Sequence, residues 1–187
     1  MRMPNLRRRW TASDLLDLPN DGNRYEVVDG ELFVTPAPSL AHQRAVKLLA
    51  RLLDDYLATQ PIGEVVIAPA DVAFSDERVL EPDLFVIPLV NGRRPNKFAD
   101  AGRLLLATEV LSPSTRRRDR LSKRVVYREE GVPEYWIVDL YARAIERSTA
   151  TDTSVEIVVQ ELEWTPEGAS ASFVLNVPDY FARVLDG

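Results

Sequence analysis

A charged residue inside an apolar run is the feature that most constrains this chain. Residues 104–111 are almost continuously apolar, as in a strand buried on both faces, yet Glu109 lies among them. A carboxylate in a protein interior costs several kcal/mol unless a partner neutralises it. We therefore expect a fold that brings a cation to Glu109.

A second acid stands at the start of another apolar run. Asp83 follows Pro82 and directly precedes residues 84–87, and a proline suits the first position of a strand. If the two strands are neighbours, Asp83 and Glu109 meet at one end of a sheet. Their carboxylates and the backbone carbonyl of Val110 would then offer three oxygen ligands to a divalent cation.

A helix is predicted directly after the Glu109 strand. Residues 112–115 offer capping side chains for a helix over about 116–130, and Gly131 and Pro133 end it. The helix carries Lys123. Its amine could orient or deprotonate an attacking water, or stabilise developing negative charge.

The predicted helix is strongly basic. Residues 116–128 contain seven basic side chains and one acid, a local charge of +6 that leaves −12 on the rest of a chain whose net charge is −6. The pattern by itself favours a solvated basic face, which many helices have, over an anion-binding surface. The candidates for contacts with nucleic-acid phosphates on such a surface are Arg116, Arg117, Arg118 and Arg120.

Composition restricts the chemistry of the predicted site. The chain has no cysteine, so thiolate zinc sites are excluded, and its one histidine, His42, argues against a histidine-built metal site. Oxygen ligands favour hard cations, so the expected metal is Mg²⁺ or Mn²⁺. No apolar run approaches the roughly 20 residues of a membrane span, and we read no signal peptide, so a cytoplasmic chain is expected.

The remaining patterns predict an α/β protein with a central mixed sheet flanked by helices. Without internal repeats, the chain is expected to be a single domain over 1–187, with 1–22 as a lead-in. Within the lead-in, residues 11–14 could cap a short helix that runs through Leu18 and ends at Pro19. The other predicted elements are a hairpin over 24–34 turning at Asp29 and Gly30, a helix over 39–59, strands over 64–74 and 134–139, a C-terminal β-meander over 144–175 with one strand over 155–164, and a short helix over 180–185.

Each candidate residue also has a structural interpretation. Asp119 and Lys123 have the spacing of an ordinary helix-surface pair. Asp83 could make local turn contacts, and Glu109 could pair with a buried arginine. Glu26 could point inward toward a site, but its pattern favours a solvent face. A histidine in the first turn of a helix, like His42, is more often structural than catalytic. The residues by themselves leave a metal site and a structural ion-pair network evenly balanced.

These residues resemble the PD-(D/E)XK nuclease superfamily. Pro82 and Asp83 match its signature, as does Glu109, whereas Leu111 stands where the signature has lysine. Within that superfamily the chain is similar to the Uma-two family of restriction-endonuclease-like proteins, in which the lysine lies in the following helix. The matching stretches are 24–31, 81–83, 109–115, Asp119 with Lys123 and Tyr127, and 131–139.

The resemblance implies a restriction-endonuclease-like fold and Mg²⁺- or Mn²⁺-dependent cleavage of phosphodiester bonds in DNA. It implies that Asp83, Glu109 and Lys123 are catalytic and that Asp83 and Glu109 bind the metal. A homodimer is expected, because such nucleases commonly cut duplexes with paired sites, and no organic cofactor is expected. Two alternatives remain: an inactive nucleic-acid-binding or regulatory module, and a structural protein, which an arginine paired with Glu109 would favour.

Overall fold

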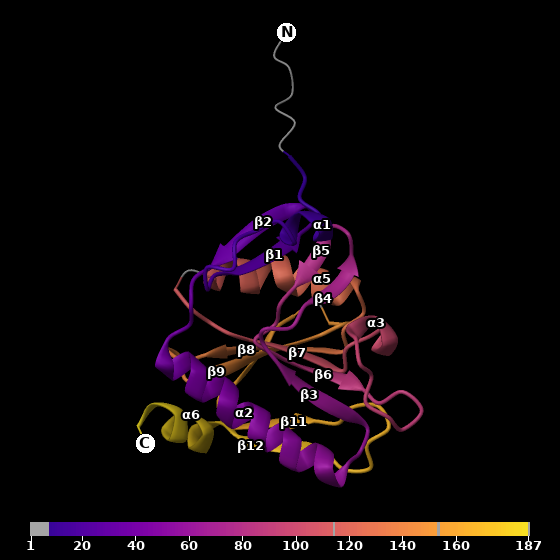
Figure 1. The fold of residues 1–187 in the computed structure, drawn as a ribbon. Helices are drawn as coiled ribbons and strands as arrows, with labels where there is room; N and C mark the ends of the chain where they lie inside the picture. The colour runs from indigo at the N-terminus through magenta and orange to yellow at the C-terminus, as the bar shows by residue number, and fades with distance from the viewer. Residues whose placement is uncertain (1–7, 114, 153, 187) are drawn as a thin grey trace.

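A six-stranded mixed sheet forms the centre of the molecule (Figure 1). The structure is a computed structural model, and it describes residues 8–113, 115–152 and 154–186. The strand order is β10-β9-β8-β7-β6-β3. The strands are β3 (Gly63–Ile67), β6 (Leu84–Pro88), β7 (Leu106–Val110), β8 (Glu134–Asp139), β9 (Ala144–Thr149) and β10 (Glu156–Val158). β7 and β8 are parallel, and the other neighbours are antiparallel.

The central strands are buried on both faces, as the apolar runs predict. Every residue of β7 and β8 is buried, Glu109 included. Alternate side chains of β6, β7 and β8 contribute to two separate apolar cores, one on each face of the sheet. The sheet is therefore the middle layer of the fold.

One face of the sheet is covered by the long helix α2 (Leu40–Thr59), which confirms the helix predicted over 39–59. Ser39 caps this helix, since its side chain accepts a hydrogen bond from the backbone N–H of His42. The helix α6 (Val177–Leu185) and the hairpin of β11 (Glu161–Trp164) and β12 (Phe173–Asn176) complete this layer. Figure 1 shows α2 and α6 on the same side of the sheet.

The other face is covered by a helical segment and a second sheet. The segment runs through α4 (Arg116–Arg118), the π-helical turn η1 (Asp119–Lys123) and α5 (Arg124–Glu129). The second sheet has the order β2-β1-β5-β4, with β1 (Arg24–Val28), β2 (Glu31–Thr35), β4 (Val72–Ser75) and β5 (Arg78–Leu80). Figure 1 shows this sheet stacked over α5.

The helix predicted over 116–130 is present, with a π-helical turn at its centre. Ser112 stabilises its start, because the Oγ of Ser112 accepts a hydrogen bond from the backbone N–H of Thr115. Ser114, another predicted capping residue, lies outside the described residues. The π-turn contains one more residue than an α-helical turn, and such turns are frequent at functional sites.

The predicted hairpin is also present. β1 and β2 pair antiparallel from Arg24 with Thr35 to Val28 with Glu31. The turn residues Asp29 and Gly30 have φ angles of 52° and 78°, the left-handed conformation that a two-residue hairpin turn requires. The first seven residues of the predicted lead-in lie outside the described residues.

Two predicted strands were wrong, because each is two strands in different sheets. Residues 64–74 contain β3 in the large sheet and β4 in the small one. Pro69 lies between them, and a proline has no N–H to continue a ladder. Residues 155–164 divide in the same way into β10 and β11. Alternation persists across both breaks because it reports burial rather than the identity of the neighbouring strand.

Short elements and one boundary were not predicted. The unpredicted elements are the strand β5 and α3 (Phe98–Ala101), whereas α1 (Ala12–Leu15) is the short helix expected within residues 11–18. α6 begins at Val177 rather than near Tyr180, because the side chain of Asn176 caps it by accepting a hydrogen bond from the backbone N–H of Asp179. Among the helices of the described residues, none has the length and apolarity needed to cross a bilayer.

Candidate active site

Strand pairing brings Asp83 next to Glu109. β6 and β7 pair antiparallel with Leu84 opposite Thr108, so the next pair outward is Asp83 and Glu109, on one face of the sheet. The backbone N–H of Val110 donates a 2.8 Å hydrogen bond to the Oδ2 of Asp83. The two carboxylates therefore lie side by side at one end of the sheet, as predicted.

Lys123 approaches Glu109 from the helical segment. Its Nζ lies 2.6 Å from the Oε1 of Glu109 and 2.6 Å from the Oε1 of Glu26, and its side chain is fully buried. The Oδ1 of Asp119 is 3.9 Å from the same Nζ. The π-turn directs both Asp119 and Lys123 into the interior, so they are not the solvated surface pair that their spacing allows.

Asp83 has two further partners. An Nη of Arg24 lies 2.8 Å from its Oδ1, and the Nε2 of His42 lies 2.9 Å from its Oδ2. Burial favours the protonated acid, but the hydrogen bond from His42, the charge of Arg24 and the Val110 N–H outweigh burial and lower the pKa of Asp83 to about 2. Asp83 is therefore a carboxylate at neutral pH.

Glu109 has the opposite balance. Burial raises the pKa of Glu109 well above its ordinary value, and repulsion from Asp83, Asp119 and Glu26 adds to this effect despite the attraction of Lys123. For Lys123, burial lowers the pKa, but the attraction of Glu109, Glu26 and Asp119 is greater and the net shift is upward. Lys123 is thus a permanent cation at neutral pH, not a proton acceptor.

The pKa of Glu109 leads to a stability prediction. Folded Glu109 binds its proton more tightly than the unfolded chain does, where the pKa is near 4.5. This contribution is fully present below that pH and is lost as the pH rises through the folded pKa. We expect the free energy of unfolding of the wild type to fall relative to that of Glu109→Gln as the pH rises from 4.5 toward neutrality. Urea unfolding of both proteins across this range measures the difference, and two parallel pH profiles would contradict the assignment.

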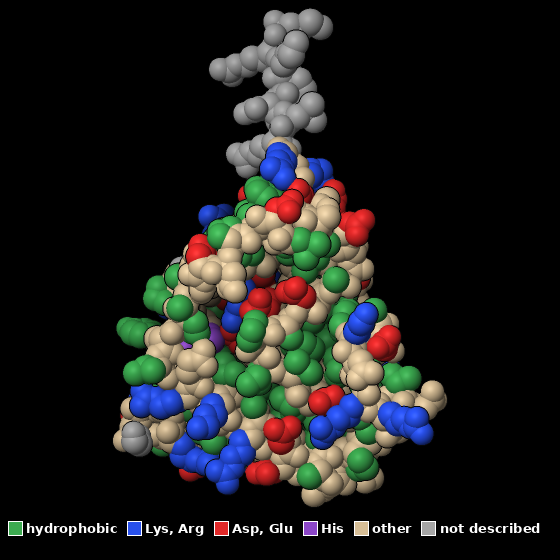
Figure 2. All heavy atoms as spheres, viewed as in Figure 1, with side chains coloured by type: hydrophobic (Ala, Val, Ile, Leu, Met, Phe, Trp, Pro, Cys, Tyr) green, Lys and Arg blue, Asp and Glu red, His purple; other side chains and the backbone are tan. Residues whose placement is uncertain are grey.

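The two carboxylates open onto a cleft of about 760 Å³. Its walls include Asp83, Glu109, His42, Arg24 and Arg116. Figure 2 shows a hollow beneath the small sheet, with acidic and basic side chains along it. A volume of this size is ample for a nucleotide.

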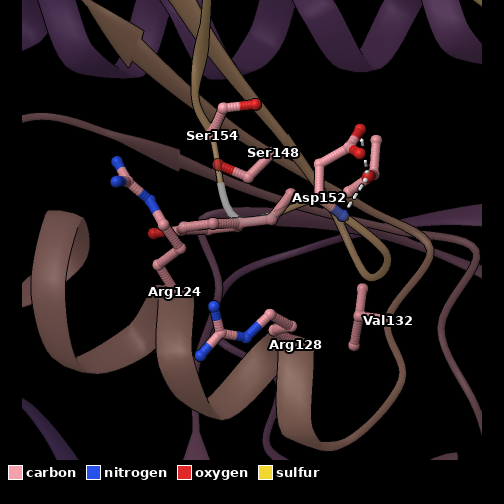
Figure 3. Close-up of a pocket in the computed structure, with 8 residues that line it drawn as sticks. Arg124, Arg128, Val132, Ser148, Asp152 and Ser154 are labelled. Atoms are coloured by element: carbon pink, nitrogen blue, oxygen red, sulfur yellow. Dashed lines mark hydrogen bonds between the residues drawn. The ribbon is translucent and has the colours of Figure 1, made fainter.

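A second, much smaller hollow lies between α5 and the β9–β10 turn (Figure 3). It holds about 20 Å³ beside Arg124, Arg128 and Ser148. This is room for roughly one water molecule, so a substrate is far too large for it.

Lys123 lies behind the large cleft of Asp83 and Glu109 rather than on its wall. Since its ammonium is fully buried and in contact with Glu109, it holds that carboxylate in position from the protein side. The catalytic assignment of Lys123 stays a prediction, and the geometry favours action through Glu109.

The four predicted phosphate-binding arginines divide into two pairs. Arg116 and Arg117 are exposed, and Arg116 lines the cleft. The Nη of Arg118 lies 3.3 Å from the Oε2 of Glu26, and Arg120 donates a 2.7 Å hydrogen bond to Asp139. The second pair is therefore engaged by internal acids, although Arg118 also lines the cleft. We retain Arg116 and Arg117 as the exposed candidates for phosphate contacts.

The sequence did not identify three residues of the site, which are Glu26, His42 and Arg24. Glu26 is fully buried, so the predicted solvent face was wrong. His42 lies in the site because the start of α2 meets the edge of the sheet, and Arg24 reaches Asp83 from β1. One sequence signal for the site was available. Arg24 and Glu26 are charged residues at alternate positions of the hairpin, so they share one face of a strand.

The donor set fits a hard divalent cation. Five carboxyl groups face three permanent cations here, which amounts to two excess negative charges when all five are ionised, the state that a bound divalent cation would favour: Glu26, Glu81, Asp83, Glu109 and Asp119 against Arg24, Arg118 and Lys123. No cluster of three or more His, Cys, Asp or Glu side chains suited to a metal occurs in the described ranges. Mg²⁺ is commonly held by one or two carboxylates together with waters and substrate phosphates, so the pair of Asp83 and Glu109 is sufficient.

The same architecture occurs in a solved structure. The chain is similar to a crystal structure described as "a putative nuclease belonging to DUF820" from Anabaena variabilis, with a TM-score of 0.76 and 18% sequence identity. The match covers 94% of this chain and 99% of that chain. The protein thus has a mixed α/β fold shared with that structure.

The family follows from the sequence match. The model of the Uma2 family, described as "Putative restriction endonuclease", matches residues 12–178. The chain belongs to the Uma2 family, which confirms the resemblance drawn from its motifs. No protein with a curated description matched the chain.

Proposed function

We propose that this protein is an endonuclease that hydrolyses phosphodiester bonds in DNA with Mg²⁺ or Mn²⁺. The observation that carries the proposal is the placement of Asp83 and Glu109 side by side on the wall of a cleft, with a buried cation behind one of them. Family membership supports the same class of reaction. The excess of buried negative charge is what a divalent cation would neutralise.

The side chains of the site have separable tasks. Asp83 and Glu109 would hold the metal, which when bound lowers the pKa of a water and offsets charge on the phosphate. Lys123 fixes the position of Glu109, and the hydrogen bond from His42 fixes that of Asp83. Arg116, on the cleft wall, attracts the phosphodiester.

The direct test is cleavage by the purified protein. Supercoiled plasmid, linear duplex and single-stranded DNA are incubated with Mg²⁺, with Mn²⁺ or with EDTA. We expect nicked or shortened products only when a divalent cation is present. The absence of products from all three substrates with both metals would refute the proposal.

One observation favours a second candidate, a nucleic-acid-binding module without turnover. Both oxygens of Asp83 already have protein partners, Arg24 on one side and His42 with the Val110 N–H on the other. If these contacts persist, Oδ2 is fully engaged and Asp83 keeps one free lone-pair direction, on Oδ1, for a metal. DNA binding without products, equal in wild type and Glu109→Gln, would identify this function. The ion-pair partner of Glu109 is Lys123 rather than arginine, so the observation proposed to favour a purely structural protein is absent from the described residues.

Arg116 and Arg117 provide a prediction for binding. The double variant Arg116→Ala, Arg117→Ala is expected to lower the slope of log K against log[salt] by about two, one for each lost phosphate contact. Fluorescence anisotropy with a labelled duplex measures the slope in EDTA, where no cleavage is expected. An unchanged slope would remove both residues from the interface.

We also propose that the protein acts as a homodimer, since two sites can then cut the two strands of a duplex. Sedimentation at several protein concentrations tests this proposal. A monomer at concentrations that support double-strand cleavage would contradict it.

A further inference from the structure

The exposed face of α2 carries a straight basic stripe. Arg44, Lys47 and Arg51 are all exposed. At 100° per residue they fall within about 60° of one another around the helix axis. The first acid of the helix is Asp54, so every charged side chain in the half of the helix nearest the cleft is basic. Figure 2 shows basic side chains gathered at the lower left, where Figure 1 places α2 and α6.

This stripe has almost no ion pairing, whereas several other cations at the surface are neutralised. Arg78, Arg143 and Arg147, for example, each contact at least one carboxylate within 2.6 Å. In the part of the chain that the structure describes, Arg44 and Lys47 have no ion pair. Arg51 has one weak contact, at 4.0 Å from Asp55, between two side chains that are about three-quarters exposed. An external anion could therefore bind the stripe without breaking a strong ion pair.

The stripe is continuous with the cleft. Gln43 lines the cleft of Asp83 and Glu109, and it also lines a shallow groove of about 820 Å³ along α2. Arg44, Lys47 and Arg51 form the side of that groove. Asp54 and Asp55 also line the groove, farther along α2 from the cleft than Gln43. A strand whose phosphate enters the cleft can therefore pass from Gln43 onto the basic half of α2 before it reaches these acids.

The spacing of the stripe suits a nucleic-acid backbone. From Arg44 to Arg51 the helix rises about 10 Å, at roughly 1.5 Å per residue. This corresponds to about three nucleotides along the axis of B-DNA, at roughly 3.4 Å per strand. Long, flexible basic side chains can absorb the remaining mismatch.

We infer that Arg44, Lys47 and Arg51 form a second phosphate-binding surface, which holds the DNA backbone beside the cleft. The inference rests on the proposed function for its ligand. It assigns DNA contacts to α2, a helix that sequence patterning marks only as amphipathic. Arg116 and Arg117 would contact the backbone from the other structural layer, so the DNA would be held from both sides of the scissile phosphate.

The test compares two triple variants with equal loss of charge. One is Arg44→Ala, Lys47→Ala, Arg51→Ala. The control is Arg93→Ala, Lys97→Ala, Arg128→Ala, which removes three exposed cations that do not line the cleft or the groove. Binding of a fluorescein-labelled 20-base-pair duplex is measured in EDTA from 50 to 200 mM salt, and thermal melts verify that both variants are folded.

The expected result is a salt slope lower by about three in the α2 variant and unchanged in the control. Over this salt range the wild type would then lose roughly fortyfold more affinity than the α2 variant. Equal slopes for wild type and α2 variant would overturn the inference, as would the absence of DNA binding by the wild type. A change from dimer to monomer in the α2 variant would also overturn it, by making the stripe a contact between copies. If the wild type binds DNA without cutting it and the slope still falls, the inference stands and the nuclease proposal fails.

Discussion

Replacing Glu109 with Gln is expected to lower the rate of DNA cleavage by roughly a hundredfold or more. The substitution keeps the size of the side chain but removes the negative charge that would bind a divalent cation. It also weakens the contact with the Nζ of Lys123, now 2.6 Å from the Oε1 of Glu109. Single-turnover cleavage of a labelled duplex at saturating Mg²⁺ measures the effect. Calorimetric titration with Mn²⁺ provides a second readout, in which the variant should show much weaker binding.

A matched control for this variant lies on the neighbouring strand. Glu134 is also a buried acid, but it is the first residue of β8, which runs parallel to β7. It therefore lies at the other end of the central strands from the cleft, where it pairs with Arg147. Glu134→Gln is expected to retain cleavage and Mn²⁺ binding wherever it is folded. Equal activity of wild type and Glu109→Gln would exclude a catalytic site at Glu109.

Replacing Lys123 with Met is expected to destabilise the protein by about 3–5 kcal/mol. Methionine fills a similar volume, so the change mainly removes the charge. Two buried carboxylates, Glu26 and Glu109, lose the ammonium that now lies 2.6 Å from each. Denaturant unfolding near neutral pH measures the loss. The deficit should shrink as the pH falls, because Glu109 can then be neutralised by a proton.

A combined variant separates charge from packing. Adding Glu26→Gln and Glu109→Gln to Lys123→Met removes the stranded charges, so most of the lost stability should return. If the triple variant is as unstable as Lys123→Met, the lysine contributes by packing instead. If Lys123→Met is as stable as the wild type, the ammonium is not the required neutralising group.

The parts of the fold that follow from local pattern were predictable. The buried strand around Glu109, the amphipathic α2 and the Asp29–Gly30 turn each depend on residues within one element. Their signals are periodicity and turn stereochemistry, which act over a few residues. The divided strand at 64–74 was not predictable in this way, because both halves alternate but pair with different partners.

The candidate site shows the same division. Asp83 and Glu109 were identifiable because a charge in an apolar setting requires an explanation. Glu26 was not, since an acid in an alternating hairpin has the pattern of a solvated residue. Only the stacking of the small sheet over the helical segment buries it against Lys123. Likewise, Arg118 and Arg120 look identical to Arg116 and Arg117 in sequence, and it is the helix orientation that directs them to internal acids.

The amino-acid sequence by itself determined that this chain must neutralise buried acids with oxygen, nitrogen and water chemistry, because it has no cysteine and a single histidine. It also determined the family through the motifs that surround those acids. Only the tertiary structure decided which cation neutralises which acid, and which basic side chains remain exposed. The physical reason is that charge pairing depends on distances of a few ångströms between elements far apart in the chain, whereas sequence patterns report burial within one element.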